Sequence, residues 1–226
     1  MNKKKNDDIY FGGVNEKILK HIKPKEVILD IGCSDGALGK KIKELYGNKV
    51  FGIELYKKAA DIAKKRLDKV VVGDIERIQI PFPKEYFDSV IFADVIEHTA
   101  EPEKVLQKVK PLLKKNGRIL VSIPNIANIF VRLKLLFGKF NYEEWGILDR
   151  NHLRFFTLDS TKELIEGNGF KIEKIEGRRN SMHLLKLQAI LDYFKLLKLY
   201  ILLDDILSNA WKSLFAQQFI IMARKK

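Results

Sequence analysis

The stretch that decides the fold is VILDIGCSDGALG, from Val27 to Gly39. Its first three residues form an apolar run typical of a buried parallel strand, which is expected to end at Asp30. Glycine allows a close approach of backbone to ligand, and a helix N-terminus offers unpaired N–H donors. The turn leads into a helix that begins near Ala37, and three glycines surround it: Gly32, Gly36 and Gly39. The stretch therefore predicts a nucleotide-type binding site between a strand and a helix.

The charges in this turn distinguish between ligands. A dinucleotide site has the spacing G-x-G-x-x-G and holds a pyrophosphate at the helix N-terminus. Here Ser34 replaces the second glycine, and the carboxylates of Asp30 and Asp35 would repel a pyrophosphate. A nicotinamide-dependent dehydrogenase is therefore disfavoured, whereas a cationic ligand without phosphate fits. The segment resembles the first motif of class I methyltransferases that use S-adenosylmethionine (SAM).

Later segments have the order and spacing of the same family. Strands alternate with helices as far as Ile123, which predicts a mostly parallel sheet with helices on both faces. The resemblance implies a Rossmann-like, doubly wound α/β fold with a seven-stranded sheet and an antiparallel last strand. An Asn116-Gly117 turn is expected before the fifth strand, and Ser160 with Glu163 forms a capping-box pattern for a helix through Glu166. After the first strand, the other six are expected within segments 50–54, 71–74, 87–94, 118–124, 170–177 and 219–222.

Carboxylates end several of these strands, at the edge where open α/β sheets bind ligands. Glu54 ends the second strand, and a carboxylate there can accept both hydroxyls of a ribose. Asp74 ends the third strand, where the family holds the adenine amino group. The alternative is that these carboxylates only cap strand ends. The resemblance implies SAM as cofactor, S-adenosylhomocysteine as product, and this cofactor-binding set: Tyr10, Asp30, Gly32, Cys33, Gly36, Glu54, Leu55, Asp74, Ile75, Ala93 and Asp94.

The segment Asp94-Val95-Ile96-Glu97-His98 carries the candidates for chemistry. Methyl transfer from a sulfonium is an in-line displacement, so alignment and exclusion of water matter most, and a base assists a hydroxyl acceptor. The predicted catalytic residues are His98 and, from the downstream segment DRNHLRFF, His152.

The same segment also suits a divalent ion, because it combines two carboxylates with imidazole. The pattern is similar to the E-x-x-E-H of ubiquinone-biosynthesis O-methyltransferases and small-RNA 2′-O-methyltransferases, which hold a metal there. Aspartate stands here in place of the first glutamate, and no metal is favoured. The alternative is a divalent metal held by Asp94, Glu97, His98 and His152.

Two regions lie outside the expected core. Residues 125–157 carry an apolar patch, three aromatic residues and GILDRNHLRFFT, and they are expected to cover the acceptor site. Residues 183–215 are rich in leucine and predict a helical insertion before the last strand. Their longest apolar run, 199–203, is far below the roughly 20 residues that span a bilayer. Four roles remain open for this insertion: a lid, a dimer face, a helix on a membrane surface, or a helix packed on its own domain.

Composition agrees with one globular domain. The chain has 226 residues, 46% of them hydrophobic, and is expected to form a single methyltransferase domain, 1–226, with a disordered tail at 1–8. Cys33 is its only cysteine, which suits a reducing compartment, and the N-terminus lacks the apolar core of a secretory signal. A cytoplasmic location is therefore expected. The net charge of +13 is spread along expected helices and favours an anionic partner only modestly.

Three functions follow. The leading one is a SAM-dependent methyltransferase that modifies a small molecule, glycan or lipid at a hydroxyl oxygen; Asn128 and the segments SIPN and GILDRNHLRFFT resemble a branch linked to such pathways. The second is an RNA or protein methyltransferase that docks through the basic surface, although no RNA-binding strand pattern supports nucleic acid. The third is a non-catalytic SAM-binding protein, which the intact strand-end motifs disfavour. Oligomeric state is left open, and membrane contact is expected only at the surface, through 183–215.

Overall fold

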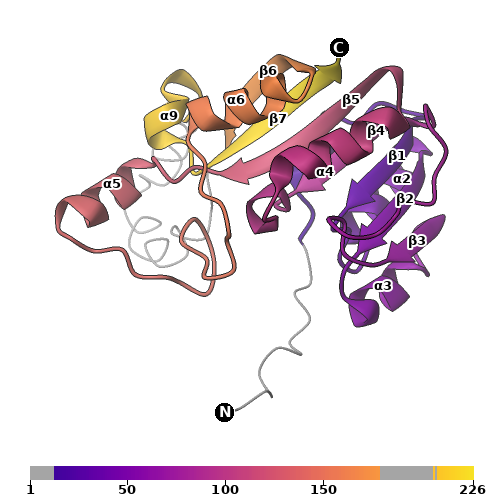
Figure 1. Ribbon diagram of the computed structural model, residues 1–226, viewed down its shortest axis with the longest axis horizontal. Coiled ribbons are helices and arrows are strands. Elements are labelled where there is room, and N and C mark those ends of the chain that lie inside the picture. The colour runs from indigo at the N-terminus through magenta and orange to yellow at the C-terminus, as the bar shows by residue number, and fades with distance from the viewer. Residues whose placement is uncertain (1–12, 179–205, 207) are drawn as a thin grey trace, which may run out of the picture.

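The structure is a computed structural model that describes residues 13–178, 206 and 208–226. One sheet of seven strands has the order β3-β2-β1-β4-β5-β7-β6 (Figure 1). β7 runs antiparallel to both of its neighbours, and the first five strands are parallel to one another. The predicted doubly wound α/β fold with an antiparallel last strand is therefore confirmed.

The strands are β1 (Val27–Ile31), β2 (Lys49–Glu54), β3 (Lys69–Val72), β4 (Phe87–Ala93), β5 (Leu113–Pro124), β6 (Phe170–Arg178) and β7 (Gln218–Lys225). The helices of the described residues are α1 (Glu16–Leu19), α2 (Ala37–Tyr46), α3 (Lys57–Ala63), α4 (Pro102–Val109), α5 (Ile129–Leu136), α6 (Leu158–Gly167) and α9 (Lys212–Phe215). Two short 3-10 turns are η1 (Ile96–His98) and η2 (Lys110–Leu112).

Alternate residues of the central strands enter two separate cores, one on each face of the sheet. Leu29 and Ile31 pack with α4 and α6, which lie together on one face (Figure 1). Ile28, directly before Leu29, packs with α1, α2 and α3 on the other face. Strands covered on both faces carry apolar side chains in both directions, which explains the continuous apolar runs in the sequence. The sheet is thereby fixed between two helical layers.

The strand order reverses at β1. This strand pairs with β2 on one side and with β4 on the other, so the chain winds outward in both directions from it. Open α/β sheets bind ligands outside the carboxyl ends of the strands at such a switch point. The loops that follow Ile31 and Ala93 therefore flank the expected site.

Local details depart from the sequence prediction. The Asn116-Gly117 turn lies inside β5, where pairing with β4 jumps from Phe87↔Leu113 to Ser89↔Arg118, so the extra residues bulge out of the ladder. The third strand ends at Val72 rather than at Asp74.

The N-terminus of α6 also begins differently from the prediction. Its capping box uses Thr157 and Ser160 instead of Ser160 and Glu163. Thr157 Oγ1 accepts the Ser160 N–H, so the helix begins three residues earlier than the sequence pattern indicated.

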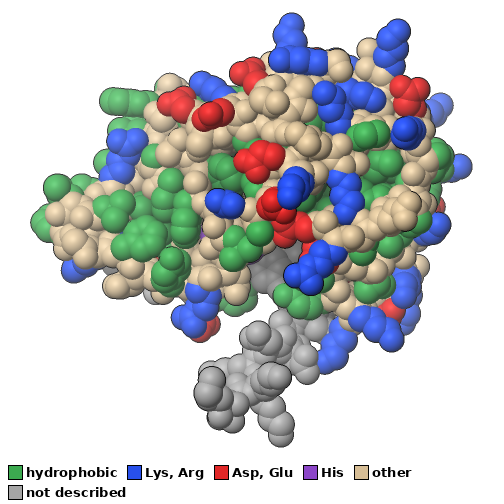
Figure 2. All heavy atoms as spheres, in the orientation of Figure 1, with side chains coloured by type: hydrophobic (Ala, Val, Ile, Leu, Met, Phe, Trp, Pro, Cys, Tyr) green, Lys and Arg blue, Asp and Glu red, His purple; other side chains and the backbone are tan. Residues whose placement is uncertain are grey.

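Several predictions fall outside the described residues: the tail at 1–8, Tyr10, and residues 183–205 of the helical insertion. In the described part of the chain, no helix is long and apolar enough to cross a bilayer. Lysine and arginine side chains are scattered over the visible face rather than gathered into one patch (Figure 2). This distribution matches the expected spread of the positive charge along helices.

Candidate functional site

The loop after β1 is held against the end of β2. The N–H groups of Gly32 and Cys33 both donate to Ile53 O, at 2.8 and 3.1 Å. Gly32 is exposed and has a φ of 67°, so it combines a left-handed backbone with an open approach for a ligand. Gly36 is buried, and a Cβ there would lie 3.1 Å from Ala63 Cα. The two glycines therefore serve different purposes: one exposes backbone and the other lets α3 pack closely.

Cys33 is a packing residue rather than a nucleophile. It is 5% exposed, and burial raises the pKa of its thiol. Its Sγ fills the space above Gly52, where an added Cβ would come within 2.5 Å of the sulfur. A thiol held in the uncharged form is inert, so only the backbone of Cys33 is available to a ligand.

Glu54 forms hydrogen bonds to two loops at the carboxyl edge. Its carboxylate accepts the N–H of Ser34 and the N–H of Tyr56, each at 2.8 Å, and the residue is 6% exposed. Each oxygen keeps a second lone pair. Glu54 therefore has a structural role that the sequence did not reveal, alongside the predicted ribose contact.

Asp30 lies beside Glu54 and is 2% exposed. Burial raises the pKa of Asp30 to about 8, and the negative charge of Glu54 adds to the shift. A cationic group brought to this position would favour the ionised form of Asp30. The pair therefore forms a buried acidic site that would favour a positively charged group.

Asp35, in contrast, is already neutralised. Arg66 Nη1 donates to its Oδ2 at 2.6 Å, and its Oδ1 accepts the Ala37 N–H at the start of α2. Asp35 is therefore not expected to repel a pyrophosphate, contrary to the sequence prediction. The missing second glycine still disfavours a dinucleotide site.

The third strand brings Asp74 next to Glu54, because the Gly73 N–H donates to Glu54 O at 2.8 Å. The Asp74 carboxylate is partly exposed, accepts the Glu76 N–H at 2.9 Å and lies 3.4 Å from Arg77 Nε. Ile75 beside it is buried. Asp74 is thus within the predicted group, with one face open to solvent.

Two apolar side chains stand exposed beyond Glu54. Leu55 is 54% and Tyr56 is 65% exposed. Leu55 belongs to the predicted cofactor-binding set, whereas Tyr56 does not. Tyr56 could have been found in the sequence as an aromatic residue shortly after a strand-end carboxylate, where a flat apolar ring can cover a planar base.

Asp94, after β4, faces β5 and β7. Its φ is 59°, its N–H donates to Ser122 Oγ at 3.0 Å, and Oδ1 accepts hydrogen bonds from Ser122 Oγ and Gln218 Nε2. Burial raises the pKa of Asp94. Ala93 before it is half-buried at the strand end. Ser122 and Gln218 were missed because only the strand order places them beside Asp94.

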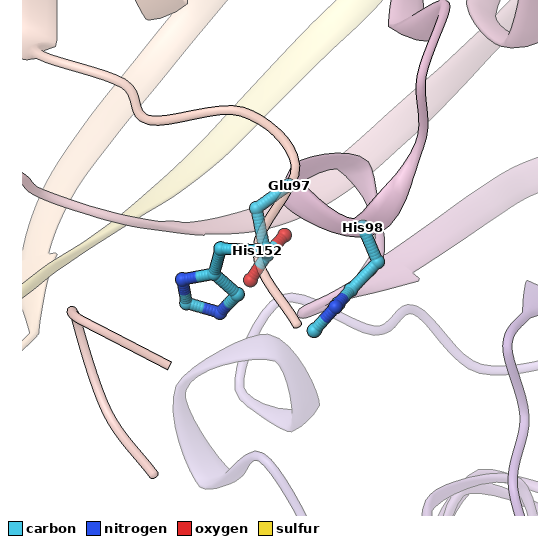
Figure 3. Close-up of side chains that lie close together, drawn as sticks. All are labelled: Glu97, His98 and His152. Atoms are coloured by element: carbon cyan, nitrogen blue, oxygen red, sulfur yellow. The ribbon is translucent and has the colours of Figure 1, made fainter. Parts of the chain in front are cut away.

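Three residues of the predicted metal alternative come together, and Asp94 is not among them. Glu97, His98 and His152 each offer a ligand atom within 4.8 Å of the others (Figure 3). The imidazole rings of His98 and His152 are 4.9 Å apart at an angle of 69°. The predicted catalytic pair, His98 and His152, is therefore adjacent in space although the two residues lie on distant segments of the chain.

Backbone hydrogen bonds attach the His152 segment to η1. The N–H groups of Leu153 and Arg154 donate to Glu97 O, at 2.8 and 3.0 Å, and the Arg154 guanidinium donates to Ala100 O. Phe155 continues the segment with an edge contact to the His152 ring. The region 125–157 therefore reaches the carboxyl edge, as its predicted role as a cover requires.

The two imidazoles have the same kind of hydrogen-bond partner. Nδ1 of His98 faces Asn151 O at 3.1 Å, and Nδ1 of His152 faces Ile147 O at 3.2 Å. A carbonyl partner selects the tautomer with hydrogen on Nδ1, so Nε2 of each ring carries a lone pair. Burial lowers the pKa of His152, and a positive charge on His98 would lower it further. Each Nε2 can therefore accept a hydrogen bond or bind a cation.

Glu97 is the unsatisfied member of the group. It is 1% exposed, and neither carboxylate oxygen has a hydrogen-bond partner. Burial raises the pKa of Glu97 well above its usual range, and the negative charge of Asp94 contributes. An orphaned buried carboxylate beside two imidazoles fits a divalent cation, which would supply the missing contacts.

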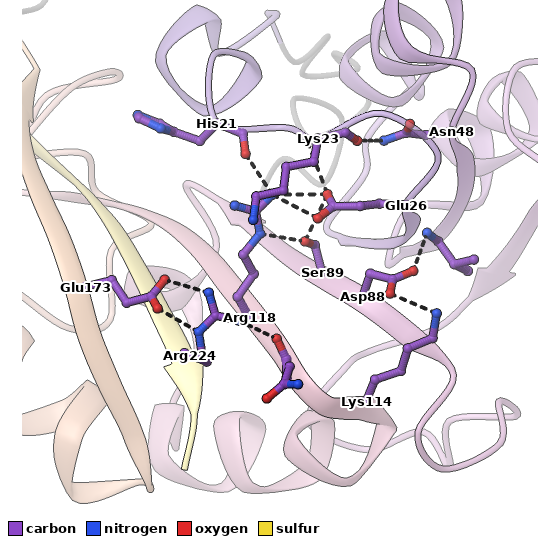
Figure 4. A network of polar contacts seen from close by, with 12 residues as sticks. His21, Lys23, Glu26, Asn48, Asp88, Ser89, Lys114, Arg118, Glu173 and Arg224 are labelled. Carbon is purple, nitrogen blue, oxygen red and sulfur yellow. Dashed lines mark hydrogen bonds and ion pairs between the residues drawn. The ribbon is translucent and has the colours of Figure 1, made fainter.

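The amino edge of the sheet is built in the opposite way (Figure 4). Arg118 is 8% exposed, and its Nη2 donates to both Glu26 oxygens, at 3.0 and 3.1 Å, and to His21 O at 2.7 Å. Its Nε donates to Ser89 Oγ at 3.0 Å. Asp88 accepts from Lys114 and from the Val27 N–H. The charges of this network are paired, and it closes the sheet at the edge away from the candidate site.

Comparisons with known proteins identify the family of the chain. A family model described as "Methyltransferase domain" matches residues 29–121. An uncharacterized methyltransferase of Geobacillus sp. (strain WCH70) is 30% identical over 169 residues, which cover 70% of this chain and 76% of that protein. The mitochondrial ubiquinone biosynthesis O-methyltransferase of Mus musculus is 26% identical over 161 residues, 66% of this chain and 42% of that protein.

A solved structure gives the same fold. A SAM-dependent methyltransferase from Archaeoglobus fulgidus superposes with a TM-score of 0.62 at 18% identity, covering 93% of this chain and 90% of the other. The chain spans about half the length of the first curated relatives that it matches. Together, the family model, the Geobacillus relative and the fold show that this chain belongs to the class I SAM-dependent methyltransferases.

Proposed function

We propose that this protein transfers a methyl group from SAM to a hydroxyl oxygen of a small-molecule, glycan or lipid acceptor. The observation that carries the proposal is the pair of imidazoles, His98 and His152, with both Nε2 atoms available at the carboxyl edge. SAM, when bound, supplies an activated methyl group on a sulfonium. Nε2 of one histidine accepts the hydroxyl proton of the acceptor as the new O–C bond forms.

The strand-end residues are proposed to bind the cofactor. Glu54 is in place to accept the ribose hydroxyls, and Asp74 to accept from the adenine amino group. Asp30, with its raised pKa and buried position, supports recognition of the positive charge of the methionine part. The exposed backbone of Gly32 supports a close approach at the same place.

A second role for the same group is supported by Glu97, whose oxygens have no partner. Glu97, His98 and His152 would hold a divalent cation, which supplies a Lewis acid that lowers the pKa of a bound hydroxyl. Asp94 is not part of this set: its Oδ1 accepts from Ser122 and Gln218, and among the described residues only Glu97, His98 and His152 offer ligand atoms within 4.8 Å of one another. Acid–base and metal roles are distinguished by experiment.

The test is formation of S-adenosylhomocysteine with a panel of phenolic, sugar and glycolipid acceptors. We expect His98→Ala and His152→Ala to lower kcat at least about 100-fold while the affinity for SAM is kept. His21→Ala is the matched control, because His21 pairs with Glu176 away from the site. Full activity of both site variants would remove the histidines from catalysis.

Chelator separates the two roles. If a cation is held, activity falls in chelator and returns with Mg²⁺ or Mn²⁺, and calorimetry shows Mn²⁺ binding that Glu97→Gln abolishes. Activity that persists in chelator leaves the acid–base role. Turnover of RNA or a protein substrate, with none for the small acceptors, would favour the alternative of docking through the basic surface. SAM binding without turnover of any substrate would favour the non-catalytic alternative.

A further inference from the structure

We propose that α5 and the residues after it insert into the surface of an anionic lipid bilayer. Residues 129–142, here called the apolar arm, project from the carboxyl edge beyond β5 (Figure 1). Hydrophobic side chains gather at this end of the molecule (Figure 2). The inference does not rest on the proposed reaction, because binding to a bilayer requires neither SAM nor an acceptor.

The tip of the arm exposes unusually large apolar side chains. Leu136 is 76% and Phe137 is 74% exposed, and Leu133 and Leu135 are 45% and 48% exposed. Isolated exposed hydrophobic residues are normal on a protein surface, but a contiguous group marks an interaction site. The tip therefore has an apolar partner.

The distribution of these residues around α5 indicates what that partner is. At 3.6 residues per turn, Leu133, Leu135, Leu136 and Phe137 are spread over an arc of about 200°, in which Arg132 also lies. A helix that docks in a protein groove presents a stripe of roughly 100°, read at every third or fourth residue. A helix that is apolar over most of its circumference instead suits immersion in an apolar phase. This favours lipid over a protein groove.

The charge of the arm favours an anionic lipid surface. Arg132, Lys134 and Lys139 are its only charged residues, and all three are exposed. Lys134 forms an ion pair with Glu143, which follows the arm, so Arg132 and Lys139 supply the net charge locally. The whole chain carries +13. Apolar side chains with interspersed lysine and arginine are typical of segments that lie in the interface of anionic membranes.

The base of the arm is fixed to the fold, so the tip is presented in a defined position. Asn128 Nδ2 donates to Phe215 O and Ala216 O, at 3.0 and 3.1 Å, and its Oδ1 accepts the Phe130 N–H. Val131 is buried at 4% exposure. The helix spans about 12 Å, which is enough to enter the interface and too short to cross it.

Flotation with phosphatidylcholine vesicles, with and without phosphatidylglycerol, tests the proposal on the full chain. We expect binding to the anionic vesicles and at least about tenfold weaker binding of Leu136→Glu. Leu45→Glu is the matched control, since Leu45 is 52% exposed on α2 and the charge change is the same. Phe137→Ser should also weaken binding, which shows that lost apolar contact and not a new acid is the cause.

Three results would overturn the proposal. Wild-type protein that does not float with anionic vesicles would exclude lipid insertion. Equal weakening by Leu136→Glu and Leu45→Glu would mean attraction through net charge alone. A dimer in sedimentation velocity that Leu136→Glu dissociates, without vesicle binding, would show that the arm contacts a second copy of the chain instead.

Discussion

Carboxylates at the amino edge of the sheet are paired with cations, whereas two buried carboxylates at the carboxyl edge, Asp30 and Glu97, have no such partner among the described residues. At the amino edge, Arg118 and Glu26 neutralise each other within a network of hydrogen bonds. At the carboxyl edge, no salt bridge among the described residues reaches Asp30 or Glu97, and burial raises the pKa of both. Groups that cost stability persist where a ligand or reaction needs them. The paired charges at the amino edge stabilise the fold, whereas the unpaired buried carboxylates at the carboxyl edge indicate a ligand-binding or catalytic site.

The largest expected effect is at the amino edge. Arg118→Met should lower the free energy of unfolding by about 3–5 kcal/mol, because it leaves the Glu26 carboxylate buried without its partner. Denaturant unfolding measures the change. The control is Lys64→Met, which breaks an exposed pair with Asp61 and should cost less than about 1 kcal/mol. Equal costs for the two variants would contradict the distinction between buried and exposed pairs.

The next effect depends on pH. The folded-state pKa of Asp30, about 8, lies above its unfolded value of 3.8, so ionisation favours the unfolded chain between these two values. The cost is absent below the lower pKa, grows as pH rises, and is complete above the upper one. Asp30→Asn should therefore match the wild type near pH 4 and become increasingly more stable than the wild type as the pH rises to 8. A constant difference across this range would show that Asp30 does not titrate as described.

A smaller gain is expected from Glu97→Leu. Replacing an unpartnered buried carboxylate by an apolar side chain of similar size should raise the unfolding free energy by about 1 kcal/mol in chelator. If Glu97 holds a cation, the same variant should also lose methyl transfer. A destabilisation comparable with that of Arg118→Met would instead make Glu97 a structural partner, and the contrast between the edges would fail.

The sequence predicts the features that depend on neighbouring residues in the chain. Apolar runs place the central strands, and carboxylates after them mark the carboxyl edge, because buried parallel strands show no alternation and end where the loops begin. Glu54 and Asp74 follow from position alone. The paired histidines were expected from the resemblance, and the structure brings them to 4.9 Å.

Other features depend on contacts between distant segments and could not be predicted. Gln218 reaches Asp94 only because β7 runs antiparallel and begins at the edge where β4 ends. Asp35 is neutralised by Arg66 from α3, so its apparent charge in the sequence was misleading. The bulge in β5 depends on register with β4, which no local pattern records.

Calorimetric titration with SAM tests most directly whether the carboxyl edge binds SAM through Glu54. Wild-type protein should bind, and Glu54→Gln should bind at least about tenfold more weakly, since each charge-assisted hydrogen bond contributes about 1.5–3 kcal/mol. Asp61→Asn, the same change at an exposed carboxylate on α3, should leave the affinity unaltered. Because Glu54 also accepts the N–H groups of Ser34 and Tyr56, a SAM analogue without ribose hydroxyls separates the two roles. We expect this analogue to bind wild type and Glu54→Gln with equal affinity. Unchanged affinity of SAM itself for the folded variant would contradict the ribose contact of Glu54.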